Sequence, residues 1–240
     1  MIQLRPSSAH KWVNCAGSPL AESAYPNTRS RIANEGTVAH HIAARVLLSG
    51  EWPTEGDEFE ILEDGSVFLE LLDGDAETIT YTEEMRAAVV KYTSTVKSYS
   101  GFDVLHVEES VDMSYLLGEG AQGTPDAWHY NSETETLTVH DLKYGFREIE
   151  AEGNWQLVCY AFSIAEKIGL PVRNFMLVIH QPRLGGRVDE HTYVSEGLSS
   201  LASIVQVSTE WAKTPNPLRT AGCFQVYGYL SKVHLVRLFD

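Results

Sequence analysis

Residues 122–180 contain two strand patterns, then a helix pattern and a third strand pattern, with little chain between them. Apolar and polar residues alternate in 122–130 and again in 137–144, and the polar turn NSETE between them suits an antiparallel connection. Residues 153–168 have the apolar spacing of an amphipathic helix. Because a crossover helix returns the chain to a parallel neighbour, we expect the apolar run FMLVIH at 175–180 to form a buried parallel strand.

Further patterns extend this core on both sides. Residues 104–111 alternate, which predicts another antiparallel strand, and residues 82–99 have helical apolar spacing. Beyond the turn LGGR, residues 191–194 read as an edge strand and residues 197–213 as a closing helix. The sequence therefore predicts an α/β fold: a helix, a three-stranded antiparallel meander, a crossover helix and a parallel strand, with helical flanks.

A helix is also predicted for residues 34–48, with Thr37 as its N-cap and His40 in its first turn. By itself, His40 is compatible with a surface histidine, with a histidine whose hydrogen bonds are satisfied, or with a ligand. Glu35 either assists a site nearby or favours the helix N-terminus through the helix dipole. The residues alone leave both alternatives open.

Length and composition favour one globular domain spanning residues 1–240, since 240 residues can bury a full core. We find no apolar run long enough to cross a bilayer and no signal-peptide pattern in residues 1–31, so we expect a cytoplasmic protein without a membrane partner. The three cysteines, Cys15, Cys159 and Cys223, are too few and too scattered for a disulfide framework.

The net charge of −15 is unevenly distributed along the chain. Thirteen acidic residues and no Lys or Arg lie between Arg45 and Arg86, whereas the rest of the chain holds twenty acidic and eighteen basic residues. A basic face for nucleic acid therefore remains possible outside this stretch. Residues 51–84 are predicted to be an acidic insertion with a two-stranded or irregular structure. It is either a solvated insertion or a surface that repels a nucleic-acid backbone or docks a basic partner.

Two carboxylates and an amine are predicted to converge on neighbouring strands. Asp126 lies in one strand pattern, and Asp141 and Lys143 share one face of the next, while Leu142 points into the core. Carboxylates suit a hard divalent cation, and a lysine beside it can hold a water or a phosphate oxygen. Taken singly, each residue could instead make a structural hydrogen bond or a surface ion pair.

Four motifs in this order resemble the PD-(D/E)xK nuclease superfamily, in its RecB-like and Cas4-like exonuclease branch and its phage and prophage relatives. The motifs are EGTVAH at 35–40, GTPD at 123–126, DLK at 141–143 and QLVCY at 156–160, preceded by SSAHKWVNCAGS at 7–18. Each motif is weak alone, but their order and their predicted elements agree with that branch.

The resemblance implies a metal-dependent DNA nuclease, preferably an exonuclease, that hydrolyses phosphodiester bonds in phage or bacterial DNA recombination or metabolism. It implies a catalytic set of Asp126, Asp141, Lys143, Gln156 and Tyr160. It implies Mg²⁺ or Mn²⁺ held by His40, Asp126, Asp141 and the backbone carbonyl of Leu142. DNA would be the partner, in the cytoplasm of a bacterial host, with a single-strand-binding or annealing protein nearby.

Other residues have less specific roles. Arg147, Arg183 and Arg187 are candidates for phosphate contacts. Trp128 and Trp155 could stack on bases or pack in the core. In the resembled family a cysteine at the position of Cys15 pairs with a C-terminal cysteine cluster to hold an iron–sulfur centre. The 214–240 tail of this chain has only Cys223, so we expect no cluster and a tail held by Phe224, Tyr227, Tyr229 and Leu230.

Two other classes of function remain open. The chain could be a catalytically silent nuclease-like protein that binds or acts as a scaffold. The acidic residues 51–84 instead suggest a DNA mimic or a regulator.

Overall fold

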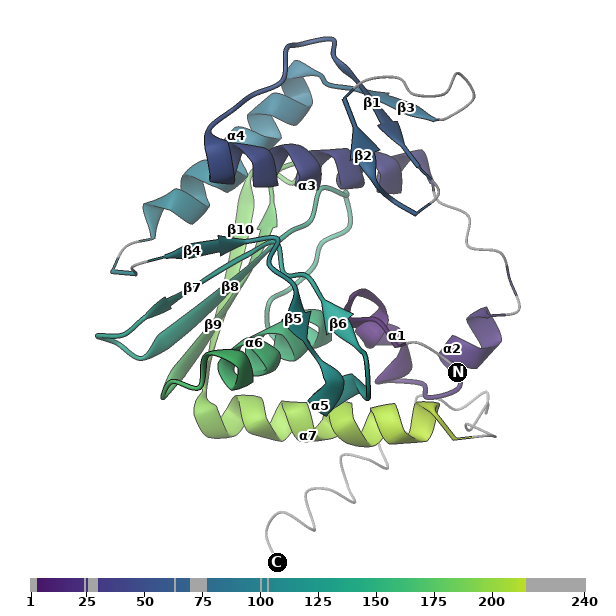
Figure 1. Ribbon diagram of the computed structural model, residues 1–240, viewed down its shortest axis with the longest axis vertical. Coiled ribbons are helices and arrows are strands. Elements are labelled where there is room, and N and C mark those ends of the chain that lie inside the picture. The colour runs from purple at the N-terminus through teal and green to yellow at the C-terminus, as the bar shows by residue number, and fades with distance from the viewer. Residues whose placement is uncertain are drawn as a thin grey trace, which may run out of the picture.

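The computed structural model describes residues 4–23, 25, 30–62, 64–69, 77–99, 101–102 and 104–214. Its centre is a five-stranded sheet with the order β10-β9-β8-β7-β4 (Figure 1). The strands are β4 (Leu105–Val107), β7 (Ala127–Asn131), β8 (Thr136–Leu142), β9 (Asn174–Gln181) and β10 (Arg187–Val194). β4, β7 and β8 are successively antiparallel, β9 is parallel to β8, and β10 is antiparallel to β9. The mixed α/β class and the parallel pairing of residues 174–181 are therefore confirmed.

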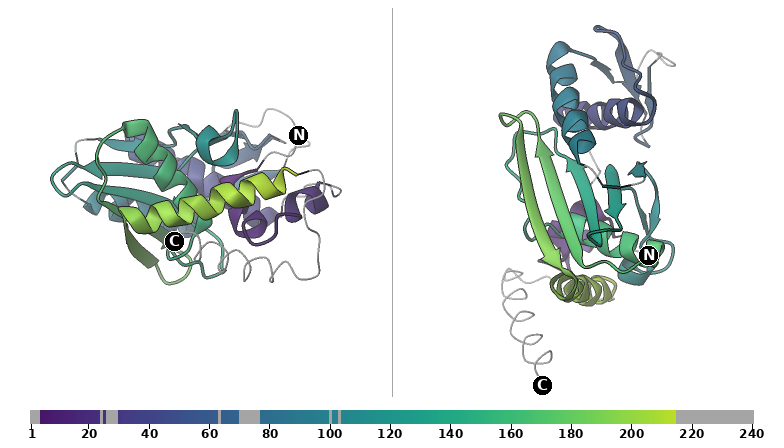
Figure 2. Two further views of the ribbon diagram at one scale, coloured as in Figure 1. Left: turned by 90° about the horizontal axis from the view of Figure 1, so that it is seen from below. Right: turned by 90° about the vertical axis from the view of Figure 1, so that its left-hand side faces the viewer.

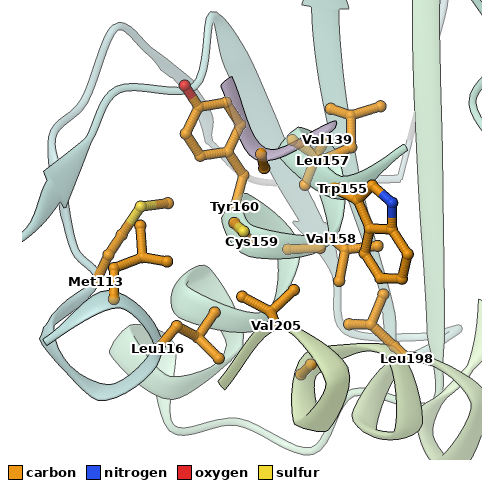
Figure 3. Packing of buried hydrophobic residues seen from close by; sticks show 14 of the residues in the cluster. Met113, Leu116, Val139, Trp155, Leu157, Val158, Cys159, Tyr160, Leu198 and Val205 are labelled. Atoms are coloured by element: carbon orange, nitrogen blue, oxygen red, sulfur yellow. The ribbon is translucent and has the colours of Figure 1, made fainter. Parts of the chain in front are cut away.

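Two helices cover one face of this sheet. α6 (Trp155–Ile168) lies between the sheet and α7 (Ser195–Ala212), so that Val139 of the sheet, Val158 of α6 and Val205 of α7 belong to one buried cluster (Figure 3). The side chain of Asn154 accepts a hydrogen bond from the amide of Leu157 and caps α6 at its start. This capped, largely buried helix holds one end of the candidate site.

A second cluster lies at the end of the sheet opposite α7 (Figures 1 and 2). It is built by α3 (Arg31–Ser49), α4 (Glu83–Ser98) and a small sheet with the order β2-β1-β3. The strands of this small sheet are β1 (Glu58–Ile61), β2 (Val67–Phe68) and β3 (Thr78–Thr80). Phe59 and Ile79 are buried against the helices. The described part of the acidic insertion therefore contains three strands, whereas a two-stranded or irregular structure was predicted.

Short elements complete the described chain: η1 (Pro6–Ser8), α1 (Ala9–Trp12), α2 (Ser18–Glu22), β5 (Val111–Asp112), α5 (Ser114–Leu117) and β6 (Gln122–Gly123). η1 and α1 pack against α6, and Trp12 and Val13 are buried as expected. Cys15 is half-buried, whereas the free thiol of Cys159 is fully buried in α6. The predictions for the tail, including Cys223, lie outside the described residues.

Several predicted boundaries were wrong. α3 begins at Arg31 because the hydroxyl of Ser30 accepts a hydrogen bond from the amide of Ala33 and caps the helix. Thr37 is therefore inside the helix, where its hydroxyl donates to the carbonyl of Ala33. His40 consequently lies in the third turn rather than the first.

The predicted strand boundaries differ in a similar way. Residues 122–130 are divided into β6 and β7, with Asp126 in the break between them, and residues 104–111 are divided into β4 and β5. Lys143 lies just beyond the end of β8, and β10 begins at Arg187 rather than at His191. Within the described part of the chain, no helix combines the length and the apolar character needed to span a bilayer.

Candidate metal centre

The break before β7 places the carboxylate of Asp126 between α3 and β8. Its Oδ1 lies 3.0 Å from Nδ1 of His40, and its Oδ2 accepts a 2.6 Å hydrogen bond from the amide of Leu142. The side chains of His40 and Asp126 are 30% and 14% exposed, so both reach the surface from well-packed elements. Asp126 is thus held at two points, and it brings the helix and the strand together.

Glu108, which the sequence analysis did not single out, lies beside His40 and Asp126 and forms a three-residue group with them. One ligand atom from each of His40, Glu108 and Asp126 lies within 4.8 Å of the other two. Glu108 directly follows β4, and its amide donates to the carbonyl of Asp126 over 3.1 Å. Its φ of 48° is in the left-handed region that glutamate rarely adopts, a conformation that concentrates at functional sites.

A second row of polar side chains runs beside this group. Nζ of Lys143 lies 2.6 Å from Oδ2 of Asp141 and donates a 2.9 Å hydrogen bond to Oε1 of Gln156. Nε2 of Gln156 in turn lies 3.4 Å from the hydroxyl of Tyr160. Asp141 is paired with Lys143 and is not part of the three-residue group. The amine is therefore fixed between a strand and α6.

Gly123 explains how Tyr160 reaches this row. A Cβ at Gly123 would lie 2.8 Å from the Tyr160 ring and 2.7 Å from the sulfur of Met113, so one or both side chains would have to shift. In Figure 3, the Tyr160 ring lies in the apolar cluster and its hydroxyl points away from the other labelled side chains. The first residue of the GTPD motif thus makes room for the last residue of the QLVCY motif.

Burial and neighbouring charges set the protonation of the group. Burial opposes the charge on His40, but the carboxylate of Asp126 outweighs it and raises the pKa of His40 to about 9. The same pairing lowers the pKa of Asp126 despite its burial. Burial and the charge of Asp126 raise the pKa of Asp141 although Lys143 opposes this.

The pKa of Glu108 also departs from its ordinary value. Neighbouring protein groups remove part of the hydration of its carboxylate although the residue is exposed, and the charge of Asp126 adds to this effect, so the pKa rises to about 7. Divalent cations bind deprotonated ligands, so a bound cation would displace protons from this site.

Two cavities meet at the site. The larger, about 1170 Å³, is lined by one face of α3, by the turn before β2 and by His40, Glu108, Asp126 and Lys143. The smaller, about 620 Å³, is lined by the segment before α6, by the start of α6, and by His10, Arg147 and Lys143. Ser7 and Lys143 line both cavities, so the candidate site lies where they join.

Other predicted site residues lie at or beyond the edges of this group. Glu35 is not part of it and pairs instead with Arg183, 2.9 Å away. Arg187 pairs with Glu148 and with Asp189, whereas Arg147 is exposed in the smaller cavity. Leu142 contacts Asp126 through its amide, and a role for its carbonyl stays a prediction.

Both candidate base-stacking residues are buried. Trp128 is 2% exposed and stacks on His106 with ring centroids 3.7 Å apart. Trp155 is 8% exposed at the edge of the smaller cavity. Core packing therefore accounts for Trp128, and for most of the surface of Trp155.

The donor set fits a divalent cation. Two carboxylates and an imidazole supply oxygen and nitrogen ligands that Mn²⁺ and similar metals accept, and Asp141 and Lys143 lie beside them. The fold and site thus define a class: an α/β protein with a candidate metal centre at the ends of strands β4, β7 and β8. A family model described as "Protein of unknown function (DUF2800)" matches residues 2–227, and the chain belongs to this family.

The chain is also similar to a crystal structure described as a "Putative exonuclease" from Eubacterium rectale. The sequence identity is 10% and the TM-score is 0.48, over 92% of this chain and 86% of that chain. Function therefore has to be inferred from this chain's own side chains.

Proposed function

We propose that this protein is a divalent-metal-dependent nuclease that hydrolyses phosphodiester bonds in DNA. One observation carries the proposal: three separate segments bring His40, Glu108 and Asp126 within 4.8 Å of one another, at a junction of two cavities that also exposes Lys143. A purely structural ion pair between His40 and Asp126 would not require Glu108 in a left-handed conformation beside it.

The residues that would hold the metal are His40, Glu108 and Asp126, with Asp141 in support. A bound divalent cation supplies Lewis-acid polarisation of a phosphate and a water of lowered pKa. Imidazole suits transition metals better than Mg²⁺, so the histidine favours Mn²⁺. The amide of Leu142 holds Oδ2 of Asp126, which leaves Oδ1 facing His40.

Lys143 supplies the positive charge that a phosphoryl transition state requires. Burial would lower the pKa of Lys143, but the carboxylate of Asp141 outweighs this and raises it, so the amine stays protonated. Asp141 and Gln156 hold the amine from two sides, so it is oriented before the substrate arrives. Tyr160 supports the amide of Gln156 and thereby acts on Lys143 indirectly.

The two joined cavities favour a polymeric substrate. A phosphate beside Lys143 would have one cavity on each side, and both extend well beyond the group of charged residues. Arg45 lies on one side of this junction and Arg147 on the other, although Glu148, Glu150 and Glu152 also line the cavity of Arg147. Each side thus offers one guanidinium for a phosphate of a strand that continues past the cleaved bond.

The motif resemblance supports the finer parts of the proposal. It favours an exonuclease over an endonuclease, a role in phage or bacterial DNA recombination or metabolism in the bacterial cytoplasm, and a single-strand-binding or annealing protein as partner. The acidic residues between Arg45 and Arg86 would keep the rest of a DNA molecule away from the small sheet by charge repulsion.

The test uses labelled linear and circular DNA, single- and double-stranded, incubated with the protein in Mg²⁺, Mn²⁺ or EDTA. We expect metal-dependent loss of linear DNA that Asp141→Ala and Lys143→Ala abolish, with circular DNA resistant. Cleavage of circles would support an endonuclease instead. Absence of cleavage with either metal would reject the proposal. It would then favour a silent scaffold, or a DNA mimic if the protein also inhibits another DNA-binding protein.

A further inference from the structure

Arg183 occupies an unusual position in the turn between β9 and β10. Its Nε lies 2.8 Å from a carboxylate oxygen of Glu84, and its Nη1 lies 2.9 Å from one of Glu35. The guanidinium carbon also lies 4.4 Å from the ring centroid of Tyr144 and 4.3 Å from that of Phe146. One side chain thus joins the start of α4, the second turn of α3 and the loop after β8.

This environment is poorly suited to phosphate binding. The side chain of Arg183 is only 11% exposed, and its guanidinium is already paired with the carboxylates of Glu35 and Glu84. A phosphate would have to displace both carboxylates to reach the guanidinium. The planar guanidinium instead matches both carboxylates and two aromatic rings at once, which an ammonium group cannot do.

The segments that Arg183 joins carry the candidate site. Glu35 precedes His40 by five residues on the same helix, and Tyr144 directly follows Lys143. A shift of α3 relative to the loop after β8 would therefore separate the imidazole of His40 from Asp126, which Leu142 holds on the β8 side.

We propose that Arg183 is a positioning residue that locks α3 against the loop after β8 and thereby holds His40 in place to bind metal. This inference rests on the proposed nuclease function. It explains part of the EGTVAH motif, because Glu35 anchors α3 and His40, on the same helix, binds the metal.

Lysine and methionine variants separate this role from phosphate binding. Arg183→Lys keeps the charge but loses the two-carboxylate geometry and the ring stacking, and Arg183→Met loses the charge as well. We expect both variants to raise the half-saturating Mn²⁺ concentration for cleavage about tenfold, as losses of supporting contacts around metal ligands do. At saturating Mn²⁺, kcat should return to at least about half of the wild-type value, and the KM for DNA should stay within about twofold.

The matched controls are Arg173→Lys and Arg173→Met. Arg173 pairs with one carboxylate, that of Glu135, 3.1 Å away, at the far end of the sheet and with 74% of its side chain exposed. These variants should change neither the Mn²⁺ requirement nor the KM. If Arg183→Lys behaves like the wild type while Arg183→Met raises the KM at an unchanged Mn²⁺ requirement, Arg183 is a phosphate ligand and the proposal is wrong.

A second readout does not depend on activity. Hydrogen exchange in EDTA should become faster in α3 of both Arg183 variants, but not in α6, because only α3 loses its anchor. Unchanged exchange in α3 would overturn the proposal even if the protein is an active nuclease. If the wild type neither binds Mn²⁺ nor cleaves DNA, the proposed function fails, and the exchange data still decide whether Arg183 holds α3.

Discussion

Two neighbouring residues of β8, His140 and Asp141, point to opposite faces of the sheet. Asp141 has charged neighbours, whereas His140 lies among other buried histidines. Asp141 lies in the polar row with Lys143, which lines the larger cavity. His140 is fully buried with His129 and His180, with ring centroids 5.3 and 5.2 Å away. Among the described residues, both ring nitrogens of His129, Nε2 of His140 and Nδ1 of His180 have no hydrogen-bond partner.

The comparison shows that partners decide whether a buried titratable group is charged. Burial lowers the pKa of His129 and of His180 to about 4, and that of His140 well below its usual value, so all three are neutral at pH 7. His40 is partly removed from water, with 30% of its side chain exposed, but the carboxylate of Asp126 keeps it protonated. Charged side chains therefore gather around Asp126 and Asp141, whereas the buried histidines on the opposite face of the sheet are uncharged.

The largest expected effect comes from Asp126→Asn, which removes a negative charge from the candidate metal site and leaves the buried histidines unchanged. We expect cleavage to fall at least about 10²-fold, because the carboxylate both binds metal and orients His40. Steady-state rates with saturating Mn²⁺ measure this. The control is Thr138→Val, a buried change on the histidine side, which should leave the rate unchanged. Equal losses in both variants would indicate a general disturbance of the sheet.

The buried histidines should make the free energy of unfolding depend on pH. The folded state disfavours the proton on His129, so below pH 6.5 the unfolded state binds more protons, and the free energy of unfolding falls as the pH drops from about 6.5 to 4. The loss should reach about 3 kcal/mol for this residue, from a pKa difference of about 2.5. Urea unfolding of His129→Phe, which keeps the stack on Phe102, should show a shallower pH dependence. Parallel curves would contradict a neutral buried His129.

Glu108→Gln tests the residue that the sequence did not reveal. We expect the half-saturating Mn²⁺ concentration to rise about tenfold, because one of the charged ligands is lost. The neighbouring Glu109→Gln is the control, since Glu109 pairs with Lys167 and His106 instead. An unchanged Mn²⁺ requirement in Glu108→Gln, measured by titrating the metal in the cleavage assay, would remove this residue from the site.

The smallest expected effect concerns Gly36, on the groove-lining face of α3. A Cβ there would meet no atom within 4 Å, so packing does not require a glycine in this helix. Gly36→Ala should raise the free energy of unfolding by about 0.5–1 kcal/mol, yet raise the KM for DNA a few-fold if the strand lies against α3. Gly197→Ala in α7, whose Cβ would make only an ordinary 3.6 Å contact, should stabilise without changing the KM.

The sequence predicted much of the core because its patterns are local. Alternation in β8, helical spacing in α6 and the apolar run of β9 each depend on a few neighbouring residues. Boundaries failed where a single side chain decided them, as Ser30 does by capping α3 seven residues before the predicted cap.

The site was less accessible from the sequence than the fold. Asp141 and Lys143 were predictable as a pair because strand geometry places them on one face. Glu108 was hidden because residues 104–111 resemble one continuous strand, and no pattern indicates that the chain turns there with φ of 48°. The clue to Glu108 is its place immediately after β4, at the edge of the sheet where β7 begins and β8 ends.

The central claim is that His40, Glu108 and Asp126 bind one divalent cation. Anomalous diffraction from crystals soaked in Mn²⁺ tests it directly, because it locates the metal without any assay of activity. We predict a peak within coordination distance of the His40 imidazole and of carboxylate oxygens of Glu108 and Asp126, and no such peak in Asp126→Asn crystals. A peak elsewhere, or none at these residues under saturating Mn²⁺, would contradict the account.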